Sequence, residues 1–149
     1  MSEDEKNNLK LIVKNQKDLE VISTYIQDGI VSVKNIVFLK KNRIFIMIIN
    51  RFMWENLNKS TYDQNKRIRA VIKFEDVLKV KSKSINQKNK NKILECLAIK
   101  CNKISNNNFE IKIFFSGDNT ITLIVEAIEA VMNDLGKAWN VQNVPKHKI

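Results

Sequence analysis

Apolar and polar residues alternate with a period of two along much of the chain, which is the pattern of half-buried β-strands. The alternation is clearest in three segments, residues 67–83, 109–115 and 121–125. A single strand over 67–83 would be about 55 Å long at about 3.3 Å per residue, so we expect two strands with a turn at Glu75-Asp76. Ser116-Gly117-Asp118-Asn119 predicts a second tight turn.

Short apolar runs predict further strands at residues 9–13, 36–39, 44–49 and 93–101. Lys40-Lys41-Asn42-Arg43 separates the second run from the third and predicts a hairpin loop. The run Ile44–Ile49 is apolar at every position, so we expect it to be a central strand that is covered on both faces. Residues 56–66 and 84–92 are polar and predict loops.

Two segments have the spacing of amphipathic helices. Asp18 is a plausible N-cap and Gly29 a plausible terminator, which predicts a helix over residues 18–28, although β-branched Val21 and Ile22 leave a strand open. Near the C-terminus a second helix is predicted, ended by Gly136, with Trp139 folding back onto it. The residues that would share one face of it are Ile124, Ile128, Val131 and Leu135.

Together these elements predict one α+β domain over residues 1–149, with an ordered core at about 9–140 and polar tails at both ends. Because successive hairpins pair antiparallel strands, we expect a mostly antiparallel, strongly bent sheet or partly open barrel, with an N-terminal helix and a C-terminal helix. The order of elements resembles a pleckstrin-homology-like barrel, and this analogy implies no function.

The formal net charge is +10, which suggests an anionic partner such as nucleic acid. However, lysine, asparagine and isoleucine are abundant and only four arginines occur, as an AT-rich genome would encode. Much of the charge is therefore expected to lie on a solvated surface. Six lysines are concentrated in one stretch that lacks acidic residues, and without them the formal charge would be +4: Lys79, Lys81, Lys83, Lys88, Lys90 and Lys92.

No apolar run approaches the roughly 18–20 residues that span a bilayer, and the acidic start of the chain lacks the features of a secretory signal. We therefore expect a cytoplasmic location and no membrane association. Cys96 and Cys101 would face opposite sides of one strand, so they are expected to be reduced core residues and neither a disulfide nor metal ligands.

Recognisable catalytic motifs are absent from the sequence. The single histidine, His147, lies in the predicted C-terminal tail, and the three glycines form neither a phosphate-binding loop nor a dinucleotide fingerprint. Glu126 and Glu129 are interpreted as the solvated face of the last helix. We expect no enzymatic activity, no metal and no cofactor.

One candidate site is the corner Asn50-Arg51-Phe52-Met53-Trp54-Glu55, directly after the most apolar run. Arg51, Trp54 and Glu55 are the candidate ligand- or partner-binding residues, because a guanidinium can stack on an indole and pair with a carboxylate. The alternative is a purely structural corner. Strand geometry predicts Phe52 and Trp54 on the inner side, and Arg51 and Glu55 on the outer side within reach of each other.

A second candidate is a basic surface on the strands of residues 67–83. It has no aromatic side chains for base stacking, so phosphate contacts alone would give weak, non-specific binding, and a solvated face is the alternative. Its residues are Arg67, Arg69, Lys73, Lys79, Lys81 and Lys83.

Several segments resemble a small bacterial family of uncharacterised proteins with a domain of unknown function. The segment Asn50-Arg51-Phe52-Met53-Trp54-Glu55 is similar to an NRFxWE motif of that family, and Asp134-Leu135-Gly136-Lys137-Ala138-Trp139 to its closing DLGxAW motif. The opening segments 9–11 and 18–28 are also similar, so the likeness covers roughly residues 9–140. The family is encoded near histidinol dehydrogenase, which implies a housekeeping setting and no particular activity.

Three functions remain open at this point. The leading one is a non-enzymatic binding or adaptor module that recognises a protein or small ligand through the corner at 50–55. The second is a nucleic-acid-associated protein that uses the basic surface, and the third is an enzyme that works through arginine and carboxylates. A pocket holding Arg51 and Glu55 would favour ligand binding, a continuous positive face would favour nucleic acid, and a buried Arg51 locked to Glu55 would favour a structural motif.

Overall fold

The computed structural model describes residues 8–56, 65–104 and 107–145, and most of them lie in β-strands. The helical elements are α2 (Gln16–Ile26) and the single turns η1 (Val33–Asn35), η2 (Lys40–Asn42) and η3 (Trp54–Asn56). The strands are β1 (Lys10–Val13), β2 (Ile30–Ser32), β3 (Ile36–Leu39), β4 (Ile44–Phe52), β5 (Lys66–Phe74), β6 (Val77–Lys83), β7 (Ile93–Lys103), β8 (Phe109–Phe115), β9 (Asn119–Val125) and β10 (Ala130–Asn140).

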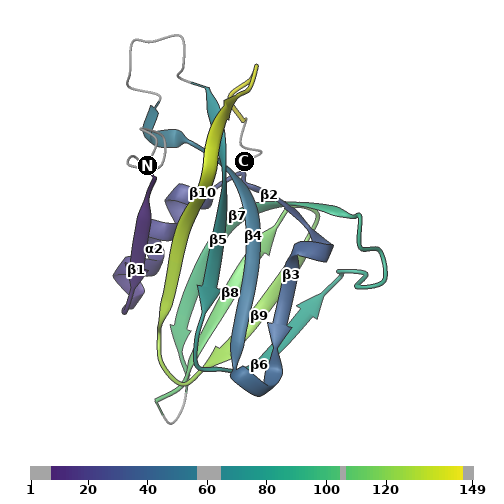
Figure 1. Ribbon diagram of the computed structural model, residues 1–149. Coiled ribbons are helices and arrows are strands. Elements are labelled where there is room, and N and C mark those ends of the chain that lie inside the picture. The colour runs from purple at the N-terminus through teal and green to yellow at the C-terminus, as the bar shows by residue number, and fades with distance from the viewer. Residues whose placement is uncertain (1–7, 57–64, 105–106, 146–149) are drawn as a thin grey trace.

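All the described strands belong to one antiparallel, strongly bent sheet (Figure 1). Its order is β1-β10-β5-β4-β2-β7-β8-β9-β6, and β3 pairs with β4 outside this path. The sheet bends back on itself, so that β10, β5, β4 and β3 lie in front of β7, β8, β9 and β6 in Figure 1. In the part of the chain that the structure describes, β3 and β6 do not pair with each other, so the sheet is open.

The hydrophobic core lies between the two layers of the bent sheet. Inward residues of the front layer such as Met47 and Ile72 are fully buried, as are Ile111 and Leu123 of the rear layer. The helix α2 closes one side of this core and packs on β7 and β4. Its buried residues are Leu19, Ile22 and Ile26.

The sequence-based prediction of the strands and hairpins over residues 9–13, 36–49, 67–83 and 93–125 is confirmed. Asp76 forms the turn between β5 and β6 with a left-handed φ of 56°. The helix α2 begins two residues earlier than predicted, because the side chain of Asn15, and not that of Asp18, accepts the capping hydrogen bond. Most of the predicted loop over 56–66, and both ends of the chain, lie outside the described residues.

The predicted C-terminal helix was wrong, and with it the α+β fold class with two terminal helices. Residues 130–140 form β10, which fills the gap between β1 and β5, so the fold is a mostly antiparallel sheet with the single α-helix α2 among the described residues. Without β10, β1 and β5 would each have an unpaired edge, and pairing with both stabilises this segment as a strand. The helical spacing of its apolar residues is a coincidence, and those residues are Ile124, Ile128, Val131 and Leu135. Ala130, Met132 and Asp134 show the true period of two, since all three are buried.

Three further expectations for this segment change with it. Gly136 does not terminate a helix; its φ of 68° lies within an irregular part of β10, where the register against β5 shifts between Leu135 and Trp139. Trp139 pairs with Arg67 of β5 in place of folding back on a helix. Glu126 and Glu129 lie in the connection between β9 and β10.

The expectation that β4 is covered on both faces was also wrong. Phe45, Met47 and Ile49 on its inner face are buried, whereas Ile46 and Ile48 on its outer face remain partly exposed. No helix among the described residues is long and apolar enough to cross a membrane.

Candidate functional site

Arg51 points into the core, and the prediction that it faces outward was wrong. The inner-face alternation of β4 runs through Phe45, Met47 and Ile49 and reaches Arg51 next, and its side chain has 0% exposure. Phe52 is buried too, as predicted, and packs edge-on against Trp54 with ring centroids 4.6 Å apart. Both faces of the chain are therefore covered at this end of β4.

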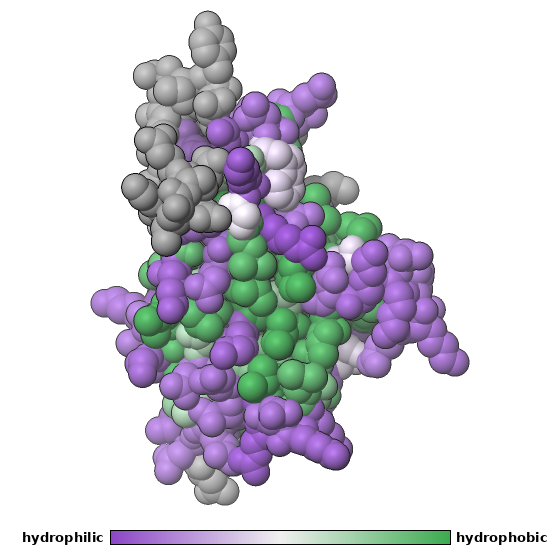
Figure 2. All heavy atoms as spheres, viewed as in Figure 1, coloured by the Kyte–Doolittle hydropathy of each residue, from purple (hydrophilic) through white to green (hydrophobic). Residues whose placement is uncertain are grey.

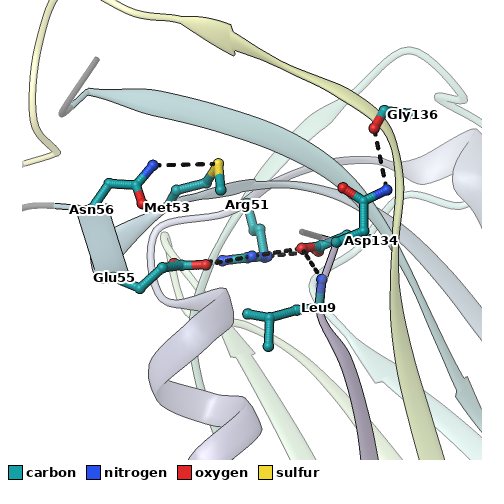
Figure 3. A network of polar contacts seen from close by, with 8 residues as sticks. Leu9, Arg51, Met53, Glu55, Asn56, Asp134 and Gly136 are labelled. Atoms are coloured by element: carbon teal, nitrogen blue, oxygen red, sulfur yellow. Dashed lines mark hydrogen bonds and ion pairs between the residues drawn. The ribbon is translucent and has the colours of Figure 1, made fainter. Parts of the chain in front are cut away.

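The buried guanidinium of Arg51 holds two carboxylates at once (Figure 3). Its Nε and Nη2 donate to Oδ1 and Oδ2 of Asp134 at 2.8 and 2.7 Å, while Nη1 and Nη2 donate to Oε1 and Oε2 of Glu55 at 2.9 and 2.7 Å. The turn η3 brings Glu55 back onto Arg51, so the predicted proximity of these two residues is confirmed. The three side chains are called the Arg51 cluster below.

The register of the sheet explains how Arg51 reaches Asp134. The strand β5 lies between them, and its inward residue Ala70 is paired with Asp134 on one side and Ile49 on the other. Neighbouring strands are about 4.8 Å apart, so the side chains of Arg51 and Asp134 together bridge roughly 10 Å between β4 and β10. The small side chain of Ala70 leaves that space open.

The Arg51 cluster also fixes the entry of the chain into β1. The N–H of Leu9 donates to Oδ2 of Asp134 at 3.1 Å, and the N–H of Asp134 donates to the carbonyl of Leu9 at 2.9 Å. The ring of Tyr25 from α2 lies 5.6 Å from the Arg51 guanidinium. One arginine thus connects β4, η3, β10, β1 and α2.

Electrostatics favour a permanently charged Arg51. Burial by itself lowers the pKa of a guanidinium, but the hydrogen bonds and charges of Asp134 and Glu55 outweigh it, so the pKa of Arg51 lies above its ordinary value. Four of its N–H groups are already used by carboxylates. This arrangement is that of a structural ion-pair cluster, because an incoming ligand would have to displace a carboxylate.

Trp54 and Arg67 attach the same corner to the chain that follows α2. Trp54 is half-buried, and its Nε1 donates to the carbonyl of Gln27 at 2.8 Å. Arg67 donates to the carbonyls of Asp28 and Asn50 at 3.2 and 3.0 Å. Burial lowers the pKa of Arg67, and the charges of Asp28 and Glu95 oppose this shift.

The six residues of the predicted basic surface are not brought together as one face. Arg67 is half-buried in the hydrogen bonds just described, and Lys73 pairs with Glu75 at 3.4 Å. Arg69 is exposed on the outer face of β5. Lys79, Lys81 and Lys83 are exposed on β6, at the other end of the sheet order.

A different feature occupies the outer face of β1, β10, β5, β4 and β3. The registers place Ile12, Val131, Lys73, Ile46 and Val37 in one row across these five strands. A parallel row runs from Asn133 through Val71 to Ile48. Figure 2 shows hydrophobic residues gathered over the middle of this face. We call it the outer aliphatic face, and its apolar residues are Ile12, Val37, Leu39, Ile44, Ile46, Ile48, Val71, Val131 and Leu135.

Sequence reasoning missed both Asp134 and the outer aliphatic face. Asp134 was hidden by the incorrect helix, which placed it outside any strand. For the outer face, the signal was the run Ile44–Ile49, which is apolar on both faces. We expected this strand to be covered on both sides, and the structure leaves one side open.

The described residues contain no group of three or more histidine, cysteine, aspartate or glutamate side chains placed to hold a metal ion. Both cysteines are free. Burial, with a further contribution from Asp28, raises the pKa of the Cys96 thiol to about 12, and burial raises that of Cys101 against a hydrogen bond from Gln16. Neither thiol has the lowered pKa of a catalytic nucleophile.

The chain belongs to the family described as "Protein of unknown function (DUF2948)", whose model matches residues 9–147. The predicted membership of an uncharacterised family is therefore confirmed. Neither the curated proteins nor the solved structures contain a significant match to this sequence.

Proposed function

We propose that this member of the family is a non-enzymatic, cytoplasmic binding module that recognises a protein partner through the outer aliphatic face. The observation that carries the proposal is the group of aliphatic side chains on β3, β4, β5, β10 and β1, on the side of the sheet away from the core, which Lys73 and Asn133 interrupt. The free thiols support a reducing compartment.

An uncovered sheet face is normally polar. In antiparallel sheets one face commonly packs on the core, and the alternate residues on the other face are polar and solvated. Here Ile12 is 60% exposed, Val37 42% and Leu135 41%, while Ile46, Ile48 and Val71 between them are partly exposed. Contiguous apolar surface of this kind is typical of interaction sites in soluble proteins.

The charges on the face favour a partner with acidic flanks. Lys10, Arg69 and Lys73 are the cations on it, and Glu75 offsets only Lys73. Packing two copies of this face together would bring like charges into contact, which disfavours a homodimer. Membrane-surface binding usually relies on several tryptophan, tyrosine or phenylalanine side chains at the interface. The residues that define this face are isoleucine, valine and leucine, and Trp139, which is 40% exposed and pairs with Arg67, lies at its end.

The other two functions have less support. The Arg51 cluster uses its guanidinium internally, which favours a structural role for the corner at 50–55 over ligand binding or catalysis. Nucleic-acid binding would require a continuous basic surface, whereas aliphatic residues of β4 and β3 lie between the cations of β5 and those of β6.

A photo-crosslinking residue at Val71, in the middle of the face, tests the proposal in the native cell, with the same residue at partly exposed Lys112 of β8 as the control. The partner identified from Val71 is then purified and titrated against Ile48→Lys and Lys112→Glu proteins. We expect Ile48→Lys to remain folded and to lose about tenfold or more in affinity, because it places a charge in an apolar contact. Lys112→Glu should bind as before.

Three results would contradict the proposal. The first is a concentration-dependent dimer in sedimentation that Ile48→Lys dissociates. The second is binding to anionic phospholipid vesicles that depends on Ile48. The third is a partner that binds the Ile48→Lys and Lys112→Glu proteins equally well.

A further inference from the structure

The open seam of the sheet lies between the edge strands β3 and β6. Among the described residues, β3 pairs only with β4 and β6 only with β9. The N–H of Val77 at the start of β6 donates to the carbonyl of Arg43 at 2.9 Å, which closes the seam at one end. Beyond that bond the described residues show no backbone hydrogen bond between the two strands. The facing edges therefore offer backbone groups to an added strand.

A mainly apolar cavity of about 160 Å³ opens between these two edges. Ile36 and Phe38 of β3, Phe45 of β4, Val80 of β6 and Ile121 of β9 line it. Engineered apolar cavities of about 150 Å³ bind benzene, so this volume accommodates one large apolar side chain. The seam thus combines backbone hydrogen-bonding groups with a place for an apolar anchor.

The loop that follows β6 closes the other end of the cavity. Gln87 donates to the hydroxyl of Ser82 at 3.0 Å, and the N–H of Lys34 donates to the carbonyl of Lys90 at 3.0 Å. Lys90 and Gln87 themselves line the cavity. A ligand that lies along β6 therefore has defined limits at both ends.

Two kinds of side chain alternate along β6, and they point to opposite sides of the strand. Val80 and Ser82 face the cavity, while Lys79, Lys81 and Lys83 are exposed. Within the described part of the chain, none of these three lysines forms an ion pair. A strand laid beside β6 would place every second side chain beside the lysines and the remaining ones at the cavity, because cross-strand neighbours on one face lie about 5 Å apart.

We propose that the seam between β3 and β6 is a peptide-binding site that takes an extended, acidic segment of a partner protein by strand addition to β6. Carboxylates at alternate positions of the segment pair with Lys79, Lys81 and Lys83. An apolar side chain between them enters the cavity and anchors the peptide. Backbone hydrogen bonds supply affinity, and the alternation supplies specificity, as in other cases of strand addition. The site shares β3 with the outer aliphatic face but uses the inward side chains Ile36 and Phe38 of that strand.

The alternation distinguishes a peptide from a simple polyanion. Nucleic acid or another polyanion would be attracted by the lysines alone and would have no use for the cavity. A peptide of the proposed kind requires both the lysines and the cavity, so rearranging its residues without changing its composition must weaken its binding.

Binding is measured with a seven-residue peptide in which glutamate alternates with valine and a central leucine, by amide chemical shifts of the isotopically labelled full-length chain. A peptide of the same composition with its glutamates grouped together is the first control, and one with alanine in place of the central leucine is the second. We expect the alternating peptide to bind with a dissociation constant on the order of 1 mM or tighter, and to shift amides of β3 and β6. Both control peptides should bind about tenfold more weakly.

Two charge reversals complete the test. Lys81→Glu should weaken the binding of the alternating peptide by about three- to tenfold, since it replaces a cross-strand attraction by repulsion. Lys103→Glu, which changes the net charge equally on β7, should have little effect. Any of three results would overturn the proposal. These are equal binding of the alternating and grouped peptides, chemical-shift changes located away from β3 and β6, and no binding up to a few times 1 mM. Ile48→Lys should leave this binding intact, so the site and the outer aliphatic face are tested independently.

Discussion

Arg51 on β4 and Asp134 on β10 form a two-bond ion pair across the strand that lies between them, although 83 residues separate them in the chain. The two segments that most resemble motifs of an uncharacterised family, residues 50–55 and 134–139, therefore meet at one point inside the molecule. Each segment supplies the charge that the other needs when it is buried.

Arg51→Ala should lower the free energy of unfolding by about 3–5 kcal/mol, because it leaves the buried carboxylate of Asp134 without its cation. Chemical denaturation followed by tryptophan fluorescence measures this. Arg69→Ala removes an exposed arginine from the neighbouring strand and should change stability by no more than about 0.5 kcal/mol. A cost for Arg51→Ala as small as that of Arg69→Ala would show that the Arg51 cluster contributes little to stability.

Gly29→Ala should destabilise the protein by about 1–3 kcal/mol through overpacking. A Cβ at Gly29 would collide with Cδ1 of Ile49 and lie 2.6 Å from its Cγ1 and 2.9 Å from the carbonyl oxygen of Ile26. Shortening Ile49 to valine removes the first of these clashes. Ile49→Val alone should cost about 0.5–1.5 kcal/mol, and the double variant should be more stable than the sum of the two single effects predicts. Strictly additive effects in thermal or urea unfolding would contradict this geometry.

Cys96 should resist alkylation in the folded protein, since its thiol is fully buried and its pKa is raised to about 12. Cys101 is only half-buried and should react first, though more slowly than a free cysteine because burial raises its pKa as well. Mass spectrometry after iodoacetamide treatment at pH 8, with and without denaturant, separates the two sites. Equal labelling rates in the folded protein would mean that the β7 strand opens readily.

Glu129→Gln should change how stability depends on pH. A hydrogen bond with Asp76 and the charge of Glu75 raise the pKa of Glu129 above its ordinary value. A group whose pKa is higher in the folded state contributes stability below its unfolded pKa and loses it as the pH rises through the folded value. The substitution should therefore stabilise the protein relative to wild type at pH 7 and bring no such gain at pH 4. Glu20→Gln on α2 is the matched control, and the same shift in both variants would exclude a specific effect of Glu129.

The strands and turns up to residue 125 could be predicted because their period of two is local information. Turn residues such as Asp76 and Gly117 marked their ends. The segment 130–140 could not, because Val131 and Leu135 satisfy a helical spacing as well as a strand spacing, and only the unpaired edges of β1 and β5 decide between them.

The candidate site shows the same limit. The proximity of Arg51 and Glu55 was predicted because both fall on one side of an extended chain, whereas in the structure the turn η3 brings them together. The side of the sheet on which Arg51 lies depends on which face of the wholly apolar run Ile44–Ile49 meets the core, and its contact with Asp134 depends on the order of strands across the sheet. Neither is local, so the sequence predicted a surface corner where the structure has a buried cluster.

The position of β10 between β1 and β5 has a consequence for how the molecule forms on the ribosome. Both flanking strands are synthesised long before β10, and Arg51 has only Glu55 as a partner until Asp134 emerges 83 residues later. The front layer of the sheet therefore stays incomplete during most of translation, with its inward apolar residues unprotected. Pairing over such sequence distances makes folding slow and leaves the nascent chain exposed to aggregation. Chaperone demand in the cell should accordingly fall only once residue 134 has left the exit tunnel.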